Sequence, residues 1–227
     1  MLFRSPQQNS HNPHNYIILD DDNNDMKEYR PRLADKELMR GLNAFGAVLI
    51  VGPKWCGKTT TAEQISKSAI YLQDTDKSNE YMQMVKIKPS LLLEGDTPRL
   101  IDEWQMAPEL WDAVRYSVDR RSDEGLYILT GSTAVDESKI IHSGAGRIGK
   151  IRMSTMSLYE SNDSNGSVSL AELFTQKKVS GRSALSIGDI ALLMTRGGWP
   201  KTIGESNEVA REQIKGYCET IVDSDVK

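Results

Sequence analysis

Apolar residues along this chain follow two different periods, and the change of period separates helices from strands. Between residues 34 and 45 the apolar side chains fall on one helix face, at Ala34, Leu38, Leu42 and Phe45. An uninterrupted apolar run follows directly, Ala47-Val48-Leu49-Ile50-Val51. A run this short and this rich in β-branched residues is typical of a strand buried on both faces of a parallel sheet. The pattern therefore predicts a helix followed by a central strand.

The same alternation continues as far as about residue 153. Helical spacing resumes at residues 58–67 and again from Pro108, where Leu110, Val114 and Val118 share one face. Further strands are predicted at residues 70–72, 99–102, 126–129 and, less regularly, 149–153. Strands that alternate with helices indicate an α/β fold in three layers, in which a parallel sheet is joined by right-handed crossovers.

The two ends of the chain differ from this central region. Residues 1–25 are rich in Asn, Gln, His and Asp and too poor in apolar side chains to form a core. In the last third, capping-box pairs predict short helices after Ser169 and Ser186, and an amphipathic pattern predicts a last helix at about 210–221. We therefore expect a disordered tail at 1–28, an α/β core at 29–160 and a small helical region at 161–227.

The clearest chemical signal lies between the first strand and the helix that follows it. Residues 52–59 match the phosphate-loop pattern G-x-x-x-x-G-K-[ST], also called Walker A. In that pattern the glycines allow a tight turn whose N–H groups face the phosphates, the lysine reaches the β- and γ-phosphates, and the hydroxyl binds Mg²⁺. The alternative is a glycine-rich turn with a solvated lysine. The expected nucleotide-binding residues are Gly52, Pro53, Lys54, Trp55, Cys56, Gly57, Lys58, Thr59 and Thr60.

An acidic pair ends the strand predicted at 99–102. Asp102, at the carboxyl end of a buried parallel strand, would face the same crevice as the phosphate loop. There it would hold Mg²⁺ together with Thr59, as a Walker B acid does. Glu103 follows and would polarise an attacking water as general base. Without the phosphate loop, the same residues would indicate only a strand that leads into an acidic loop.

Four more residues are candidates for the catalytic site. Ser132 and Thr133 follow the strand at 126–129 and would hydrogen-bond a γ-phosphate or the attacking water, although an ordinary polar turn explains them equally well. Arg147 and Arg196 are candidate cations for the γ-phosphate charge, with solvated surface arginines as the alternative. The predicted catalytic set is Glu103, Lys58, Arg147 and Ser132.

Composition removes several classes of protein. No run approaches the ~18 apolar residues that a membrane-spanning helix needs, and the first residues lack the apolar segment of a secretory signal. Two cysteines in 227 residues exclude a disulfide scaffold and favour the cytoplasm. The net charge is −4, so no overall basic field indicates nucleic acid, and a local nucleic-acid site is left undecided.

Taken together, these motifs resemble those of the AAA+ superfamily of P-loop ATPases. The nearest resemblance is to the prokaryotic predicted ATPases whose AAA domain precedes a nuclease-like domain of unknown function. It covers about Tyr29 to Ile221. The residues that carry it are the phosphate loop, Leu100-Ile101-Asp102-Glu103-Trp104-Gln105, Ile128-Leu129-Thr130-Gly131-Ser132, Gly146-Arg147, Met156-Ser157-Leu158-Tyr159-Glu160 and Gly197-Gly198-Trp199-Pro200.

The resemblance has several implications for the fold and the site. The strand that carries Thr130 would lie between the Walker A and Walker B strands, and Ser132 or Thr133 would be the sensor-1 residue. Arg147 would be an arginine finger or a sensor, and the helices around Arg196 would form a small lid over the nucleotide. ATP and Mg²⁺ would be the cofactors, and the chain would form a homo-oligomer.

Two features depart from the family pattern. The chain stops at Lys227, where the second domain of the family would begin, so the C-terminal domain of full-length relatives is expected to be missing. The Walker B strand is also short, because Pro98 and Arg99 stand directly before it.

These observations predict a cytoplasmic AAA+ type ATPase module with no membrane partner, in which Mg²⁺-dependent ATP hydrolysis drives a conformational switch. Two alternatives remain open: an ATP-gated binding or scaffold module with little hydrolysis, and a P-loop phosphotransferase. Loss of turnover in Glu103→Gln would separate an enzyme from a scaffold.

Overall fold

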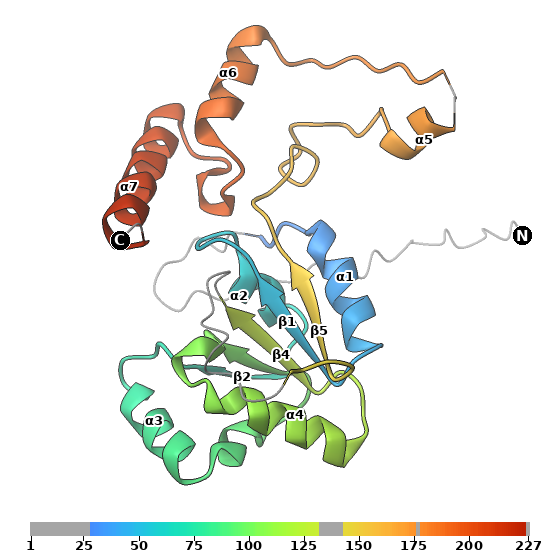
Figure 1. Cartoon of the computed structure of the whole chain (residues 1–227). Coiled ribbons are helices and arrows are strands. Elements are labelled where there is room, and N and C mark those ends of the chain that lie inside the picture. The colour runs from blue at the N-terminus through green and yellow to red at the C-terminus, as the bar shows by residue number, and fades with distance from the viewer. Residues whose placement is uncertain (1–27, 132–142, 176–177, 226–227) are drawn as a thin grey trace, which may run out of the picture. The chain divides into compact units, whose positions relative to one another are not determined.

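A five-stranded parallel sheet organises the residues described in this computed structural model, which are 28–131, 143–175 and 178–225 (Figure 1). The strands are β1 (Ala47–Val51), β2 (Ser68–Tyr71), β3 (Arg99–Asp102), β4 (Tyr127–Gly131) and β5 (Ile148–Arg152). Their spatial order is β2-β3-β4-β1-β5, and every neighbouring pair is parallel. β4 therefore lies between β1 and β3, as the family resemblance implied. The sheet lies within the unit Arg32–Lys227.

The central strand β1 is covered on both faces. All five of its residues are buried. Ala47, Leu49 and Val51 belong to one apolar core, whereas Val48 and Ile50 belong to another. Because side chains alternate along a strand, the two cores lie on opposite faces of the sheet. The uninterrupted apolar run is thus explained by burial on both sides.

Helices supply the other half of each core. On one face α1 (Leu33–Leu42) contributes Leu38 and Leu42. On the other face α4 (Glu109–Arg121) contributes Leu110, Val114 and Val118. The core on the α4 side also receives residues of α3 (Ser78–Ile87) and of the 3-10 helix η1 (Pro89–Leu93). The predicted three-layer α/β fold is confirmed.

Two local expectations were inaccurate. The sequence pattern did not predict α3, in which only Val85 is buried and the remaining apolar residues are half-buried or exposed, so that no regular apolar stripe is visible. The helix expected at 58–67 is the shorter α2 (Lys58–Glu63). It ends early because β2 begins at Ser68, which pairs with Arg99 at the start of β3.

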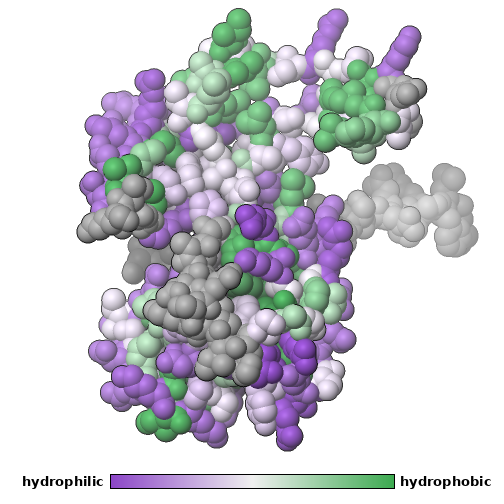
Figure 2. All heavy atoms as spheres, in the orientation of Figure 1, coloured by the Kyte–Doolittle hydropathy of each residue, from purple (hydrophilic) through white to green (hydrophobic). Residues whose placement is uncertain are grey.

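The last third of the chain is helical. It contains α5 (Leu170–Phe174), α6 (Ile187–Arg196), the 3-10 helix η4 (Pro200–Thr202) and α7 (Asn207–Asp225). The capping box predicted for α6 is present, because the Asp189 N–H donates to Ser186 Oγ at 3.1 Å and the Ser186 N–H donates to Asp189 Oδ2 at 2.8 Å. Both α5 and α6 carry large exposed apolar side chains, among them Phe174, Ile187 and Met194 (Figure 2). No described helix combines the length and the apolar character needed to cross a membrane.

Candidate functional site

The glycine-rich loop (Gly52–Gly57) connects β1 to α2. A Cβ atom on Gly52 would lie 2.3 Å from the Met153 carbonyl oxygen, so only glycine fits there. Two residues of the loop adopt left-handed backbone, Trp55 with φ of 68° and Gly57 with φ of 94°. Left-handed residues in a tight loop turn nearby N–H groups toward a common point, which is how backbone nests bind anions. The local backbone therefore suits a phosphate.

Lys58, the first residue of α2, folds back over this loop. Its Nζ donates hydrogen bonds to the carbonyl oxygens of Gly52, at 3.1 Å, and Pro53, at 3.0 Å. The residue is only 5% exposed. The lysine charge is thus held at the loop itself.

Asp102, at the carboxyl end of β3, joins three elements through one oxygen. Its Oδ1 accepts a hydrogen bond from Thr59 Oγ1 of α2 at 2.6 Å and one from Thr130 Oγ1 of β4 at 2.7 Å. Asp102 is 8% exposed and Thr130 is fully buried. The structure therefore brings together Thr59 and Asp102, the two residues predicted to bind a metal ion, and adds Thr130 to them.

Glu103 follows Asp102 and leaves the strand in a left-handed conformation, with φ of 54°. Its backbone N–H donates to Thr130 Oγ1 at 3.0 Å, so the same hydroxyl fixes both acidic residues. Its carboxylate accepts a hydrogen bond from the Gln105 side-chain amide in the short helix η2 (Trp104–Met106). Glu103 is thus placed beside the Asp102 network, and its carboxylate already has a donor.

Gly131 gives room for this arrangement. A Cβ on Gly131 would lie 2.8 Å from Gln105 Oε1 and 2.9 Å from Trp104 Nε1. Both of those atoms are buried and have no hydrogen-bond partner among the residues that the structure describes. The glycine in the Thr-Gly-Ser sequence therefore allows the segment after β3 to pack against the end of β4.

The structure does not bring every predicted residue to this site. Arg147 precedes β5 and lies at the amino ends of the strands, whereas the glycine-rich loop follows the carboxyl end of β1. Arg147 and the glycine-rich loop thus lie at opposite ends of the strands. The Nε of Arg147 pairs with Asp119 at 2.7 Å. Arg196 pairs with Asp163 at 2.7 Å. Ser132 and Thr133 lie outside the described residues.

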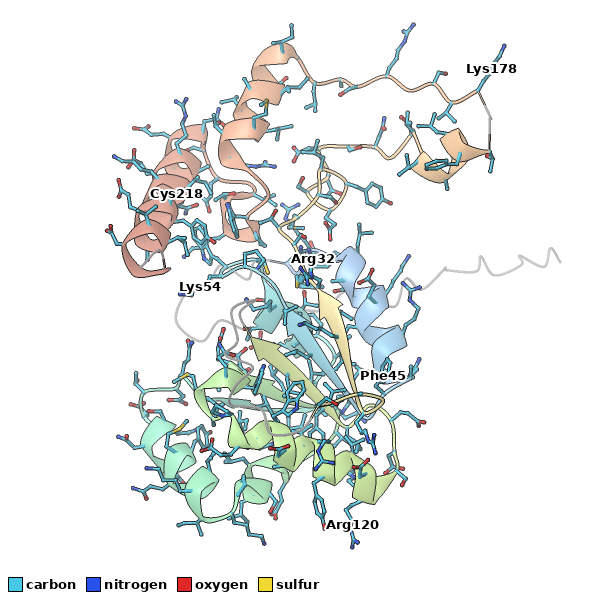
Figure 3. All side chains as sticks on the ribbon, viewed as in Figure 1. Arg32, Phe45, Lys54, Arg120, Lys178 and Cys218 are labelled. Carbon is cyan, nitrogen blue, oxygen red and sulfur yellow. The ribbon has the colours of Figure 1, made fainter. Side chains whose placement is uncertain are left out.

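Sequence reasoning missed Arg32, which supports the loop from within the protein (Figure 3). Its guanidinium donates to the carbonyl oxygens of Cys56 and Ser154, each at 2.8 Å, and to Glu160 Oε1 at 3.0 Å. Its position directly before α1 is the only signal in the sequence, because short polar residues are preferred at a helix N-cap and arginine is not.

Glu160 completes this support. Its carboxylate also accepts hydrogen bonds from the N–H groups of Leu33 and Ser157 and from the Ser157 hydroxyl. Burial would raise the pKa of Glu160, but these donors together with Arg32 outweigh burial and lower the pKa below its ordinary value. The carboxylate is therefore charged at neutral pH and pairs with Arg32.

Cys56, whose carbonyl accepts from Arg32, is fully buried in the loop. Burial raises the pKa of its thiol, and the nearby charges of Lys58 and Arg32 only partly oppose that effect. The thiol is therefore neutral and packs as a small side chain.

The comparison with protein families agrees with this geometry. A family model described as an AAA domain matches residues 44–162, just over half of the 227 residues. The matched range contains the glycine-rich loop, Asp102, Glu103 and Thr130. This chain belongs to the AAA domain family.

Known relatives of this AAA chain are longer than it is. Two uncharacterized proteins, one from Mycobacterium bovis and one from Mycobacterium tuberculosis, are each 29% identical to it over 199 residues, which cover 86% of this chain and 39% of theirs. The chain thus spans about two fifths of the length of these relatives. A solved structure from work on katanin self-assembly is similar with a TM-score of 0.37 and 11% identity, over 84% of this chain and 68% of that one.

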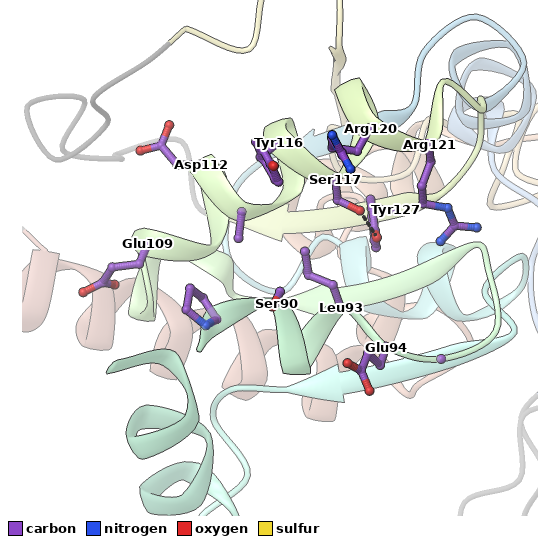
Figure 4. Close-up of a pocket in the computed structure, with 13 residues that line it drawn as sticks. Ser90, Leu93, Glu94, Glu109, Asp112, Tyr116, Ser117, Arg120, Arg121 and Tyr127 are labelled. Carbon is purple, nitrogen blue, oxygen red and sulfur yellow. Dashed lines mark hydrogen bonds between the residues drawn. The ribbon is translucent and has the colours of Figure 1, made fainter. Parts of the chain in front are cut away.

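The AAA chain also has a concave surface away from the loop. A groove of about 710 Å³ lies between η1 and α4, lined by acidic residues such as Glu109 and basic residues such as Arg120 (Figure 4). Tyr127 lines it and is the first residue of β4, so the groove is at the amino end of the strands. None of the predicted site residues that the structure describes lines it, and the chemistry described above is not found there.

Proposed function

We propose that this chain binds ATP with Mg²⁺ at the glycine-rich loop and hydrolyses it. AAA domains are generally ATPases and typically bind ATP with Mg²⁺. The observation that most supports the proposal is the pair of hydroxyls on Asp102, from Thr59 and Thr130, next to Glu103 and the loop. A loop hydroxyl, a strand-end aspartate and an adjacent acid are the groups that P-loop hydrolysis requires.

Thr59 and Asp102 fit a Mg²⁺ ion by their chemistry. Mg²⁺ prefers hydroxyl and carboxylate oxygens, and it is usually held by one or two protein carboxylates together with waters and nucleotide phosphates. Among the residues that the structure describes there is no group of three or more His, Cys, Asp or Glu side chains suited to a metal ion. A site of two protein ligands completed by the nucleotide is therefore the arrangement proposed. The bound ion would neutralise charge on the β- and γ-phosphates.

The protein's own groups have distinct roles in this proposal. The Lys58 ammonium group has three N–H donors, and two of them now donate to loop carbonyl oxygens. In the nucleotide complex it would donate to the phosphates in place of one of these carbonyl oxygens. Thr130 fixes the backbone of Glu103, and the carboxylate would orient and polarise the attacking water. Gln105 donates to Oε2 of that carboxylate, so Oε1 would accept from the water.

The contact between Gln105 and Glu103 favours a second candidate function. An amide donor on Oε2 would restrict how the carboxylate orients the attacking water, so the chain would bind ATP and hydrolyse it slowly. Such a module would report nucleotide occupancy to a partner.

A homo-oligomer is part of the proposal. Arg32 is occupied beneath the loop, Arg196 pairs with Asp163, and Arg147 is at the opposite sheet edge. An arginine from a neighbouring copy would supply the cation that the γ-phosphate needs. Turnover per molecule should therefore rise with protein concentration.

The remaining assignments extend the proposal to the rest of the chain. Residues 29–160 would act as the ATPase core and residues 161–227 as a lid. Hydrolysis would switch the position of the lid in a cytoplasmic protein. Any further domain of the longer relatives would receive that switch.

The test compares ATP binding and phosphate release in four proteins. Calorimetry with and without Mg²⁺ should show that Lys58→Ala abolishes binding, whereas Lys67→Ala, an exposed lysine just beyond α2, leaves it intact. Glu103→Gln should keep binding and lower phosphate release by about 10²- to 10⁴-fold. Absence of ATP binding by the wild type would refute the proposal. Binding without release at any protein concentration would select the slow module instead.

A further inference from the structure

Three aromatic rings from distant parts of the sequence meet beside the glycine-rich loop. Trp55 of the loop stacks on Tyr217 of α7, with ring centroids 5.7 Å apart and an angle of 13° between the planes. Tyr217 also contacts Trp199, with centroids 4.4 Å apart. The Tyr217 hydroxyl donates to the Lys54 carbonyl oxygen at 3.4 Å. Figure 3 shows Lys54 on the loop and Cys218, next to Tyr217, on α7.

Trp55 occupies a position that a side chain disfavours. With φ of 68° it is left-handed, and for a residue with a Cβ atom this conformation is roughly 5- to 30-fold less populated than the right-handed one. Gly57 adopts the same region without that penalty. A tryptophan in this conformation persists only where surrounding contacts hold it.

The ring behind Tyr217 is firmly anchored. A Cβ on Gly198 would lie 2.1 Å from the Met156 carbonyl oxygen, and the Met156 N–H donates to the Gly198 carbonyl oxygen at 2.6 Å. Trp199 follows Gly198 and packs against the core that contains Leu38. Trp55 also contacts Trp199, with ring centroids 6.4 Å apart, so the three rings form one cluster in which Tyr217 touches both the anchored ring and the ring of Trp55.

We propose that Tyr217 is a positioning residue for nucleotide binding: by stacking on Trp55, it holds the glycine-rich loop in the left-handed turn that its phosphate-binding N–H groups need. The inference rests on the proposed nucleotide site and adds the residue that controls its shape. Because coupling between two sites is reciprocal, a bound nucleotide in turn strengthens the docking of α7 on the loop. The stack thereby connects the nucleotide to a helix that begins about 150 residues further along the chain.

The test is a double-mutant cycle on the full chain, with affinity for ADP and Mg²⁺ measured by calorimetry. Tyr217→Ala should weaken binding about 10-fold when residue 55 is tryptophan, because the strained turn loses its support. In the Trp55→Gly background the same substitution should change affinity less than twofold, because glycine adopts the turn without help. Tyr217→Phe keeps the ring and should retain affinity within about twofold.

Each outcome of this cycle has a different meaning. A loss of affinity in Tyr217→Ala that is equal in both backgrounds would show general damage to α7 and would overturn the inference. Binding that is insensitive to Tyr217→Ala with Trp55 present would overturn it as well, while leaving the proposed function intact. Failure of the wild type to bind ADP or ATP would overturn the proposed function and this inference together.

Discussion

Replacing Arg32 by methionine tests how the glycine-rich loop is supported. Methionine is unbranched like the arginine stem but lacks the guanidinium, and the Arg32 side chain that it replaces is 5% exposed. The substitution deletes three interactions at once, with the carbonyl oxygens of Cys56 and Ser154 and with Glu160. The charge of Glu160 then loses its buried partner.

The expected loss follows from these contacts. Removing one partner of a buried ion pair typically costs about 3–5 kcal/mol. Glu160 keeps its three donors from Leu33 and Ser157, so the lower end of that range applies. We expect the free energy of unfolding to fall by about 3 kcal/mol, which is a large share of the 5–15 kcal/mol typical of a domain.

Urea denaturation measures this loss. Arg40→Met is a matched control, because Arg40 is exposed on α1 and, within the described part of the chain, donates only to the Lys36 carbonyl oxygen of its own helix. It should change stability by no more than about 0.5 kcal/mol. In a cycle with Glu160→Gln, the two substitutions should be non-additive. A loss below about 1 kcal/mol for Arg32→Met, or additive effects, would refute the assigned role of the pair.

Three other predictions concern single residues. Folding lowers the pKa of Glu160, so the contribution of its charge to stability is complete above the ordinary pKa of 4.5 and is lost as pH falls through the folded-state pKa. The stability difference between wild type and Glu160→Gln should therefore shrink below pH 4.5. Acid titrations followed by circular dichroism measure it. Cys56 is buried with a raised thiol pKa while Cys218 is exposed, so a thiol reagent should modify Cys218 much faster, and equal rates would contradict the packing described. Thr130→Val removes the hydroxyl that contacts both Asp102 and Glu103, so it should lower phosphate release at least 10-fold and affect ATP binding less. The control Thr195→Val, on the exposed face of α6, should change neither phosphate release nor ATP binding.

The central strands β1 and β4 were predictable because all of their residues are buried. The apolar run at 47–51 coincides with β1, since no polar residue interrupts a doubly covered strand, whereas β3 has only Leu100 and Ile101 between Arg99 and Asp102. Helix α3 was not predictable in the same way, because it packs only its edge against the core and exposes Ile87 at its end. Periodicity reports burial, and α3 has little of it.

Some residues of the candidate site could be predicted from the sequence, and others could not. Residues within a local motif, such as Lys58, Asp102 and Glu103, could be found from the sequence because the motif itself implies their proximity. Thr130 and Arg32 act through contacts between distant segments, which spacing alone does not encode. The position of Arg147 at the far edge of the sheet depends on strand direction, which a linear motif does not reveal.

The motifs that appeared unrelated to nucleotide chemistry converge on the glycine-rich loop from two sides. Glu160, at the end of the Ser-Leu-x-Glu sequence, holds Arg32 against the Cys56 carbonyl. The Gly-Gly-x-Pro sequence fixes Trp199, on which Tyr217 rests while it stacks on Trp55. One support acts on the backbone of the loop and the other on a side chain, and neither residue pair needs to touch a nucleotide. Substitutions in these distant motifs should therefore weaken nucleotide binding through the shape of the loop, and their effects should be non-additive, because the Met156 N–H donates to the Gly198 carbonyl oxygen and the two supports act on adjacent loop residues.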